Sequence, residues 1–139
     1  WYSLNPGSTY HEACKTVFGA MNEHPEMVAG TGEFDTELIR HTNGKLIAKI
    51  GAEAVYCIGI KEKDLGVCIK IADGSERAVY PVVIQLLLEL GVLNDSEYEK
   101  LKSWHKTKLL NNLEEHIGYI IPIFQKNEIL SLGSRVNLN

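Results

Sequence analysis

Residues 45–71, KLIAKIGAEAVYCIGIKEKDLGVCIKI, contain three apolar runs that decide the fold. The runs cover residues 45–50, 55–60 and 66–71, and they are rich in the branched side chains that favour strands. Their linkers are too short for the crossover that parallel strands need, so we expect an antiparallel meander. All three runs are apolar on both faces, which predicts a sheet covered on both sides.

Helical patterns surround this stretch. Apolar residues recur at helical spacing in residues 13–21, and Asp35 is expected to cap a short helix behind it. Two further helices are predicted, over residues 75–90 and residues 95–106. A capping box of Asn94 and Glu97 begins the second of these, and a last strand is expected over residues 117–124. The order predicts an α+β fold in which helices flank an antiparallel sheet.

Composition excludes several classes of protein. The 139 residues suit one domain, with 45% hydrophobic and 23% charged residues. A net charge of -4 argues against nucleic-acid binding, which would need a basic patch. The longest apolar run is shorter than the ~18 residues of a membrane helix. The start carries no basic-then-apolar signal peptide, and the use of cysteine leads us to expect a cytoplasmic protein.

The cysteines Cys14, Cys57 and Cys68 are odd in number and widely spaced. This spacing fits neither a disulfide framework nor a zinc motif, and each cysteine has apolar neighbours. We expect them to act as small buried hydrophobic residues, and we expect no metal or other cofactor.

Lys49 is the most informative polar residue, because it interrupts an apolar strand. Strand alternation places it on the same face as Ile47 and Gly51. One interpretation is an edge lysine that points into water. The other is a lysine that points into a site, where burial would demand a partner for the ammonium group or a role in proton transfer. Gly51 and Ala52 would then leave room for a ligand.

Two more candidates lie near this lysine in the sequence. Glu53 follows at once, and it either balances Lys49, binds a substrate ammonium group or sits in water. Gly30 and Gly32 flank Thr31, and this pair of glycines predicts a tight turn.

Two extended motifs resemble a known family. Residues 28–36 read V-A-G-T-G-E-F-D-T, and residues 48–56 read A-K-I-G-A-E-A-V-Y. These resemble the asparaginase II family, the Rhizobium-type L-asparaginases, which carry V-A-G-T-G-x-F-D-T and A-K-x-G-A-E-G-V-Y in this order. With looser matches at residues 65–74 and 111–122, the resemblance covers roughly residues 20–122. More distantly, Lys-x-Gly on a strand before two antiparallel strands and a helix resembles the serine β-lactamase, penicillin-binding and glutaminase fold.

The resemblance implies hydrolysis of the side-chain amide of L-asparagine to L-aspartate and ammonia. A Ser-x-x-Lys serine in the N-terminal half of such enzymes is the nucleophile. The lysine that corresponds to Lys49 would be catalytic, shuttling protons or holding a second serine. Gly51 and Ala52 would form the wall of the substrate site, Glu53 would contact substrate, and Thr31 and Gly32 would shape a loop nearby.

The same resemblance predicts that residues 1–139 are one segment, the C-terminal portion of a longer domain. Its expected partners are a small-molecule amide, the N-terminal half of the same protein and a second copy of the chain. By itself, the segment is expected to be inactive. Two residues depart from these patterns: Ile50 stands where related Lys-x-Gly motifs often have Thr or Ser, and Ala54 stands where the family motif has Gly.

Three alternatives stay open. The Ser-x-x-Lys sequence of Ser103 and Lys106 has the spacing of a serine nucleophile and its lysine, but it falls in a lysine-rich helix where a chance match is easy. A β-lactamase-like or glutaminase-like hydrolase would act on a different amide. A non-catalytic interaction domain would use its apolar surfaces for binding and leave Lys49 as a surface residue.

Overall fold

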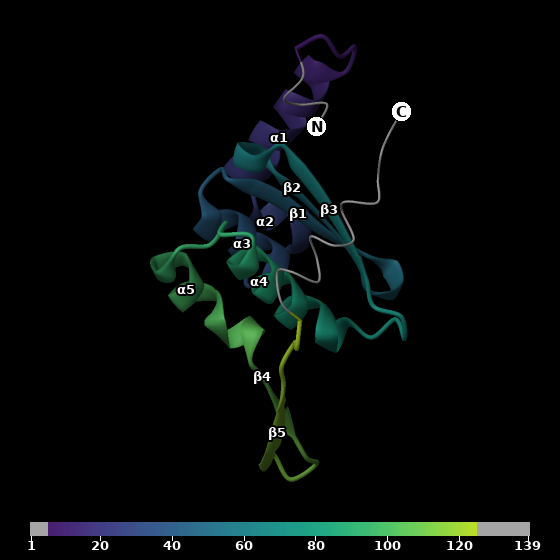
Figure 1. Cartoon of the computed structure of the whole chain (residues 1–139), viewed down its shortest axis with the longest axis vertical. Helices are drawn as coiled ribbons and strands as arrows, with labels where there is room; N and C mark the ends of the chain where they lie inside the picture. Colours follow the sequence, from purple (N-terminus) through teal and green to yellow (C-terminus); the bar gives the residue numbers. More distant parts are fainter. Residues whose placement is uncertain (1–5, 125–139) are drawn as a thin grey trace.

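The computed structural model describes residues 6–124 and confirms the α+β fold (Figure 1). Single turns of 3-10 helix connect several elements: η1 (Ala52–Ala54), η2 (Lys61–Lys63) and η3 (Glu76–Ala78). The helices and strands, in chain order, are α1 (His11–Glu23), α2 (Glu26–Ala29), α3 (Phe34–Thr42), β1 (Leu46–Gly51), β2 (Val55–Ile60), β3 (Leu65–Lys70), α4 (Val79–Glu89), α5 (Asp95–His105), β4 (Thr107–Leu110) and β5 (His116–Ile120).

The expected meander is confirmed. Strands β1, β2 and β3 pair antiparallel in sequence order, with η1 and η2 as their connections. In this register Cys57 of β2 lies opposite Lys49 on one side and Cys68 on the other. Within residues 6–124, strand β1 is an edge strand of this sheet, so Lys49 lies on a strand whose outer side pairs with no other described strand.

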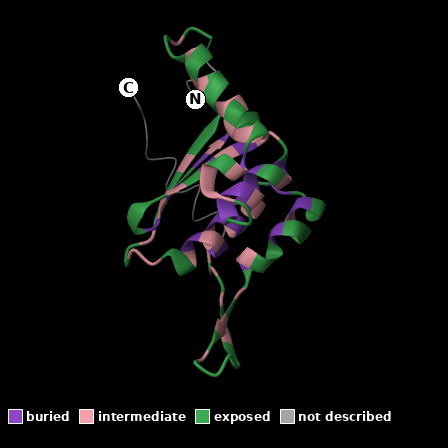
Figure 2. Cartoon of the chain, turned by 180° about the vertical axis from the view of Figure 1, so that it is seen from behind, coloured by how far each residue is buried: buried purple, intermediate pink, exposed green. Residues whose placement is uncertain are grey.

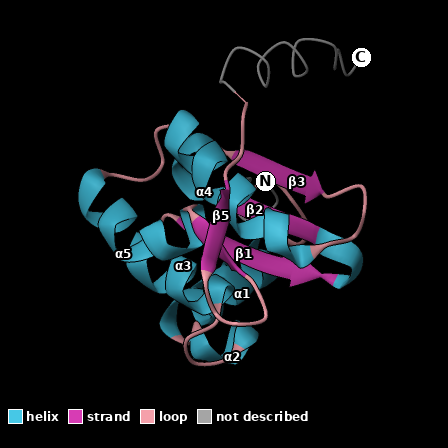
Figure 3. Cartoon of the chain, turned by 90° about the horizontal axis from the view of Figure 1, so that it is seen from below, coloured by secondary structure: helices cyan, strands magenta, loops and turns pink. Residues whose placement is uncertain are grey.

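Only one face of the sheet is covered within residues 6–124. Helices α3, α4 and α5 lie together on one side of the three strands (Figure 3), and the side chains beneath them are buried. The opposite face carries Lys49, Cys57 and Cys68, all of which are exposed. The prediction of a sheet covered on both sides is therefore wrong for this part of the chain. The buried strand residues are Leu46, Ala48, Tyr56, Ile58 and Ile60.

Helix α4 contributes a large share of the core, and Figure 2 colours the buried residues of the chain purple. Val79, Val83, Ile84 and Leu87 are fully buried. Pro81 lies in the first turn of the helix, where its missing N–H has no intrahelical partner to lose. The helix therefore starts close to the proline and needs no kink.

Helix α5 begins as the sequence predicts. Asn94 Oδ1 accepts from the Glu97 N–H at 3.0 Å, and the Glu97 carboxylate accepts from the Asn94 N–H at 2.9 Å. The Glu97 carboxylate also forms an ion pair with Lys45, whose Nζ lies 2.8 Å away. This ion pair fastens α5 to the residue before β1, so the capping box contributes to tertiary structure as well as to the helix.

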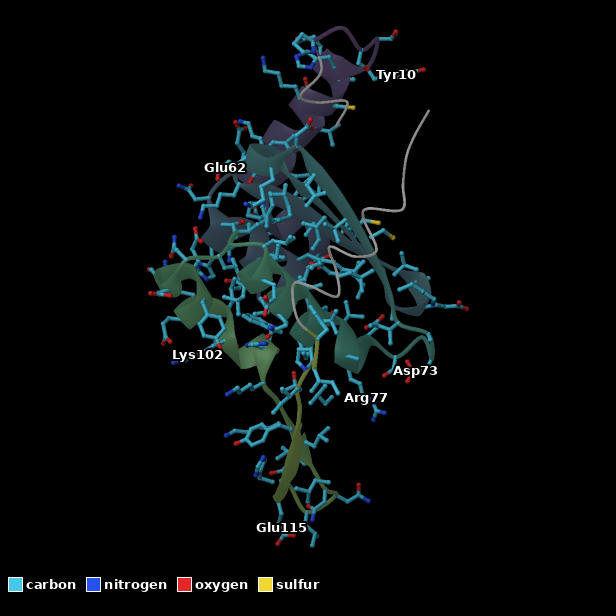
Figure 4. All side chains as sticks on the ribbon, in the orientation of Figure 1. Tyr10, Glu62, Asp73, Arg77, Lys102 and Glu115 are labelled. Carbon is cyan, nitrogen blue, oxygen red and sulfur yellow. The ribbon has the colours of Figure 1, made fainter. Side chains whose placement is uncertain are left out.

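Two elements project from the body in opposite directions. Helix α1 has no buried residue, and Val17 on its apolar stripe is exposed. The β4–β5 hairpin projects at the other end, and Figure 4 places Tyr10 and Glu115 at these two extremes. The predicted last strand corresponds to β5, whereas β4 was not predicted. The exposed apolar side chains of the hairpin and the residues that follow it are Leu110, Leu113, Ile117, Tyr119, Ile121 and Ile123.

Acid is expected to destabilise the protein through His105, which is buried at the end of α5. Its Nε2–H can donate to Gln85 Oε1 at 3.0 Å, while Nδ1 accepts from the Tyr98 hydroxyl at 3.1 Å. Burial lowers the pKa of His105, and Lys106 lowers it further. The unfolded chain then binds the proton more readily, so this stability is present above the ordinary pKa of 6.5 and is lost as pH falls below it.

Urea unfolding at pH 7.5 and pH 5.5 checks this expectation. His105→Gln should show a smaller loss of unfolding free energy between the two pH values than the wild type. His24→Gln, a change at an exposed histidine, is the control and should keep the wild-type loss. Equal losses in all three proteins would contradict the assignment.

Candidate functional site

Lys49 lies at the edge of the sheet and also on its open face. Its side chain is 51% exposed, and it stands near the end of β1. Lys49 therefore combines both interpretations of the sequence, the edge lysine in contact with water and the lysine that points into a site. Within residues 6–124 the burial expected of a site lysine is only half realised, but the ammonium group does have a buried partner.

That partner is Asp35, which is 2% exposed. Asp35 Oδ2 accepts the Ile50 N–H at 2.9 Å and lies 3.4 Å from Lys49 Nζ. The carboxylate thus satisfies an outward N–H of the edge strand and anchors the lysine beside it. A carboxylate in the first turn of a helix is also favoured by the helix dipole.

Asp35 is not the helix cap that the sequence suggested. Glu33 holds the N-cap position of α3, without a side-chain cap bond, and Asp35 lies inside the first turn. The side chains of residues 34–36 point to three different parts of the fold. Phe34 enters the core, Asp35 reaches β1, and the Thr36 hydroxyl donates to the Pro25 carbonyl at 3.0 Å. A sequence signal for Asp35 was its position between Phe34 and Thr36, both of which are buried, because a carboxylate between buried neighbours needs a partner.

The second oxygen of the Asp35 carboxylate, Oδ1, has no hydrogen-bond partner within residues 6–124. Asp35 Oδ1 and the Tyr56 hydroxyl are both buried, and neither completes a hydrogen bond within residues 6–124. The two groups are close enough to influence each other: burial raises the pKa of Tyr56 strongly, and the nearby Asp35 charge raises it further. The Tyr56 phenol therefore stays protonated beside the carboxylate.

Aromatic rings and carboxylates complete this end of the sheet. Phe34 lies against Tyr56, Tyr80 and Trp104, with ring centroids 5.8, 4.4 and 5.7 Å away. Burial raises the pKa of Tyr80, and the charges of Glu76, Asp35 and Glu33 raise it further. Carboxylates at the start of α3 and in η3 thus lie near the Tyr80 ring, and Asp35 links this cluster to Lys49.

The residues predicted to line the site follow Lys49 directly. Gly51, Ala52 and Glu53 are exposed at the turn between β1 and β2. Glu53 has a left-handed backbone (φ 55°), and its carboxylate lies 3.9 Å from Lys70 Nζ. Lys49 is therefore balanced by Asp35 and not by Glu53.

The departures at Ile50, from related Lys-x-Gly motifs, and at Ala54, from the family motif, have different consequences. Ala54 has φ 56°, a left-handed conformation that glycine adopts without a steric cost, so the Gly of the motif suits this backbone better. The Ile50 side chain packs against the core on the covered side of β1. A hydroxyl at this position would point away from the face that carries Lys49, which reduces the importance of its loss.

The predicted Thr31–Gly32 turn is present just before α3. Gly32 has φ 82°, and Thr31 is exposed, with no side-chain hydrogen bond inside the described part of the chain. The turn leads directly into the helix that carries Asp35. Its contribution to the site thus runs through the position of α3, since no hydrogen bond or ion pair joins it to Lys49 within residues 6–124.

Ser103 and Lys106 lie elsewhere. They are exposed at the end of α5, on the helical side of the sheet, whereas Lys49 is on the open face. Among the described residues, Lys49 donates to no serine or threonine hydroxyl. Residues 6–124 also contain no group of three His, Cys, Asp or Glu side chains placed to hold a metal ion.

The fold and the site define an α+β protein with a carboxylate-anchored lysine on an open sheet face. The family model of L-asparaginase II matches residues 2–122, so the chain belongs to this family. No curated protein matches the chain. None of the helices within residues 6–124 has both the length and the apolar character needed to cross a bilayer.

Proposed function

We propose that this chain provides the lysine-bearing side of an amidohydrolase site that converts L-asparagine to L-aspartate and ammonia. The observation that carries the proposal is the buried Asp35 carboxylate, which holds both Lys49 Nζ and the Ile50 N–H. A residue fixed in this way presents its ammonium group in one place. Membership of the L-asparaginase II family supplies the reaction class.

In the proposed reaction a serine Oγ attacks the side-chain amide carbon and ammonia leaves. Water then hydrolyses the acyl-enzyme ester and releases aspartate. Lys49 would pass a proton to or from a hydroxyl in this sequence, or hold that hydroxyl by a hydrogen bond. Gly51, Ala52 and Glu53 would form the adjacent wall, and Thr31 and Gly32 would shape the loop before α3.

The nucleophile would come from outside residues 6–124. We place its segment, the N-terminal half expected from the resemblance, over the open face of the sheet. Lys49 lines a shallow groove of about 660 Å³ there, together with apolar residues such as Met21 and Ile47. The unburied faces of α1 and of this sheet support the placement, because such apolar surface is normally covered.

Ammonia release tests the proposal. The product of the complete gene should release ammonia from L-asparagine faster than from L-glutamine, and it should leave a chromogenic cephalosporin intact. The 139-residue chain alone should release none. Turnover by the chain alone would place the nucleophile inside it, whereas preference for glutamine or the cephalosporin would favour the alternative hydrolases.

A non-catalytic interaction domain is the second candidate. The exposed apolar side chains of the β4–β5 hairpin favour it, since an isolated two-stranded hairpin is only marginally stable without a partner. The rest of the protein or a second copy of the chain would be that partner. A complete gene product without activity on any of these amides would support this candidate.

A further inference from the structure

We propose that Cys57 and Cys68 form a reversible oxidation site, in which the two thiols close into a cross-strand disulfide when they meet a small-molecule disulfide such as oxidised glutathione. The site lies on the open face of the sheet. The inference concerns the 139-residue chain, in which this face is open, and it does not depend on the proposed amidohydrolase activity.

The two thiols are already neighbours. Cys57 of β2 and Cys68 of β3 are direct partners in the strand register, and their sulfur atoms are 3.7 Å apart. Both residues are exposed. The expectation that they are buried hydrophobic residues is therefore wrong, because it assumed a sheet covered on both faces.

The backbone at this pair suits a disulfide. The Ile71 N–H donates to the Ala54 carbonyl at 3.1 Å, so residues 54 and 71 form a hydrogen-bonded pair of the β2–β3 ladder. Such pairs alternate with non-hydrogen-bonded pairs, and three steps along the ladder the pair of Cys57 and Cys68 is of the second kind. Non-hydrogen-bonded pairs have Cα atoms about 4.5 Å apart, within the range that disulfides span. Side-chain rotation alone can close the bond.

The reaction balances without any further reagent. One cysteine thiolate attacks a sulfur of oxidised glutathione, which forms a mixed disulfide and releases one glutathione. The second cysteine loses its proton and attacks the mixed disulfide, which forms the Cys57–Cys68 bond and releases another glutathione. The protein thiols are oxidised by two electrons, and the glutathione disulfide is reduced by two. Burial and the neighbouring Cys68 raise the pKa of Cys57, so oxidation should accelerate as pH rises.

A disulfide between Cys57 and Cys68 would lie next to Lys49. Cys57 lies directly opposite Lys49 on β1, and Lys49, Cys57 and Cys68 line the same groove. Closing the bond would join β2 to β3 beside the lysine. Cys14 lies on α1 and has no thiol neighbour among the described residues, so the chain contains its own reference cysteine.

Equilibration of the 139-residue chain with glutathione redox buffers at pH 8 tests the site. After acid quenching and alkylation, peptide mapping should show a Cys57–Cys68 bridge and an alkylated Cys14. The glutathione ratio at half-oxidation should indicate an effective thiol concentration at least ~10-fold higher in native buffer than in 8 M urea, because the fold removes the entropy of closing this loop.

Two variants provide the controls. Cys14→Ser should leave the half-oxidation ratio unchanged. Cys68→Ser combined with Gly66→Cys moves the thiol two residues along the same face, where an added side chain meets no atom within 4 Å. Diagonal neighbours lie about 7–8 Å apart, so this variant should lose the native advantage. Equal half-oxidation ratios in native buffer and in urea, separate glutathionylation of the two cysteines, or equally ready bridging by the displaced thiol would each overturn the proposal.

Discussion

Replacing Lys49 with alanine is expected to lower kcat for asparagine hydrolysis by the complete gene product at least ~100-fold, the scale for a positioned proton-transfer group. The structure gives the reason: Asp35 fixes the Lys49 ammonium at the end of β1, beside the turn that would form the substrate wall. KM should change less than kcat, because the lysine acts on the reacting groups more than on the rest of the substrate.

Two further variants sharpen this test. Lys49→Arg keeps the positive charge near Asp35 but cannot give up its proton, so it should remain folded and still lose activity. Lys63→Ala removes an exposed lysine from the η2 turn and should have no effect. Normal turnover by Lys49→Ala would contradict the role assigned to this residue.

Replacing Asp35 with alanine is expected to lower the free energy of unfolding by about 2–3 kcal/mol. The change leaves the Ile50 N–H without its buried acceptor, a loss that typically costs ~1–3 kcal/mol. It also removes the partner of the half-exposed Lys49 ammonium, which adds about 1 kcal/mol or less. Urea unfolding of the 139-residue chain measures the loss. Activity of the complete gene product should also fall, because Lys49 is no longer held in place.

The charge of Asp35 can be separated from its shape. Asp35→Asn retains an oxygen that accepts from the Ile50 N–H, so its unfolding free energy should stay within ~1 kcal/mol of the wild type. It removes the negative charge beside Lys49, and kcat should therefore fall, by less than the ~100-fold expected for losing the lysine itself, even though the fold is retained. Glu62→Gln neutralises an exposed carboxylate in a turn and serves as the control (Figure 4). Wild-type activity in Asp35→Asn would show that the ion pair has no part in catalysis.

Local features of the fold were predictable because short-range physics decides them. Short linkers restrict the three strands to an antiparallel meander, and the structure has this order. The Asn94–Glu97 capping box needs only neighbouring atoms, and both of its hydrogen bonds are present. Lys49 was singled out in a different way, because the continuous motif of residues 48–56 resembles the asparaginase II family.

Other parts of the site depend on contacts between distant residues. Asp35 reads locally as a helix cap, yet it bonds to a strand 15 residues further along the chain. Glu53 is closer in sequence to Lys49 than Asp35 is, but its turn directs it toward Lys70. Apolar alternation cannot report which face of a sheet stays uncovered, so the exposure of Cys57 and Cys68 was missed.

The resemblance of residues 48–56 to the family motif singled out Lys49. The sequence by itself also determined the strand order, the antiparallel pairing and the helix that Asn94 caps. Those features follow from side-chain period, linker length and hydrogen bonds between near neighbours. Only the tertiary structure decided that α3, α4 and α5 cover a single face, that Asp35 anchors Lys49 and that two thiols meet on the open face. These depend on which surfaces bury one another, a balance summed over the whole chain that no short segment contains.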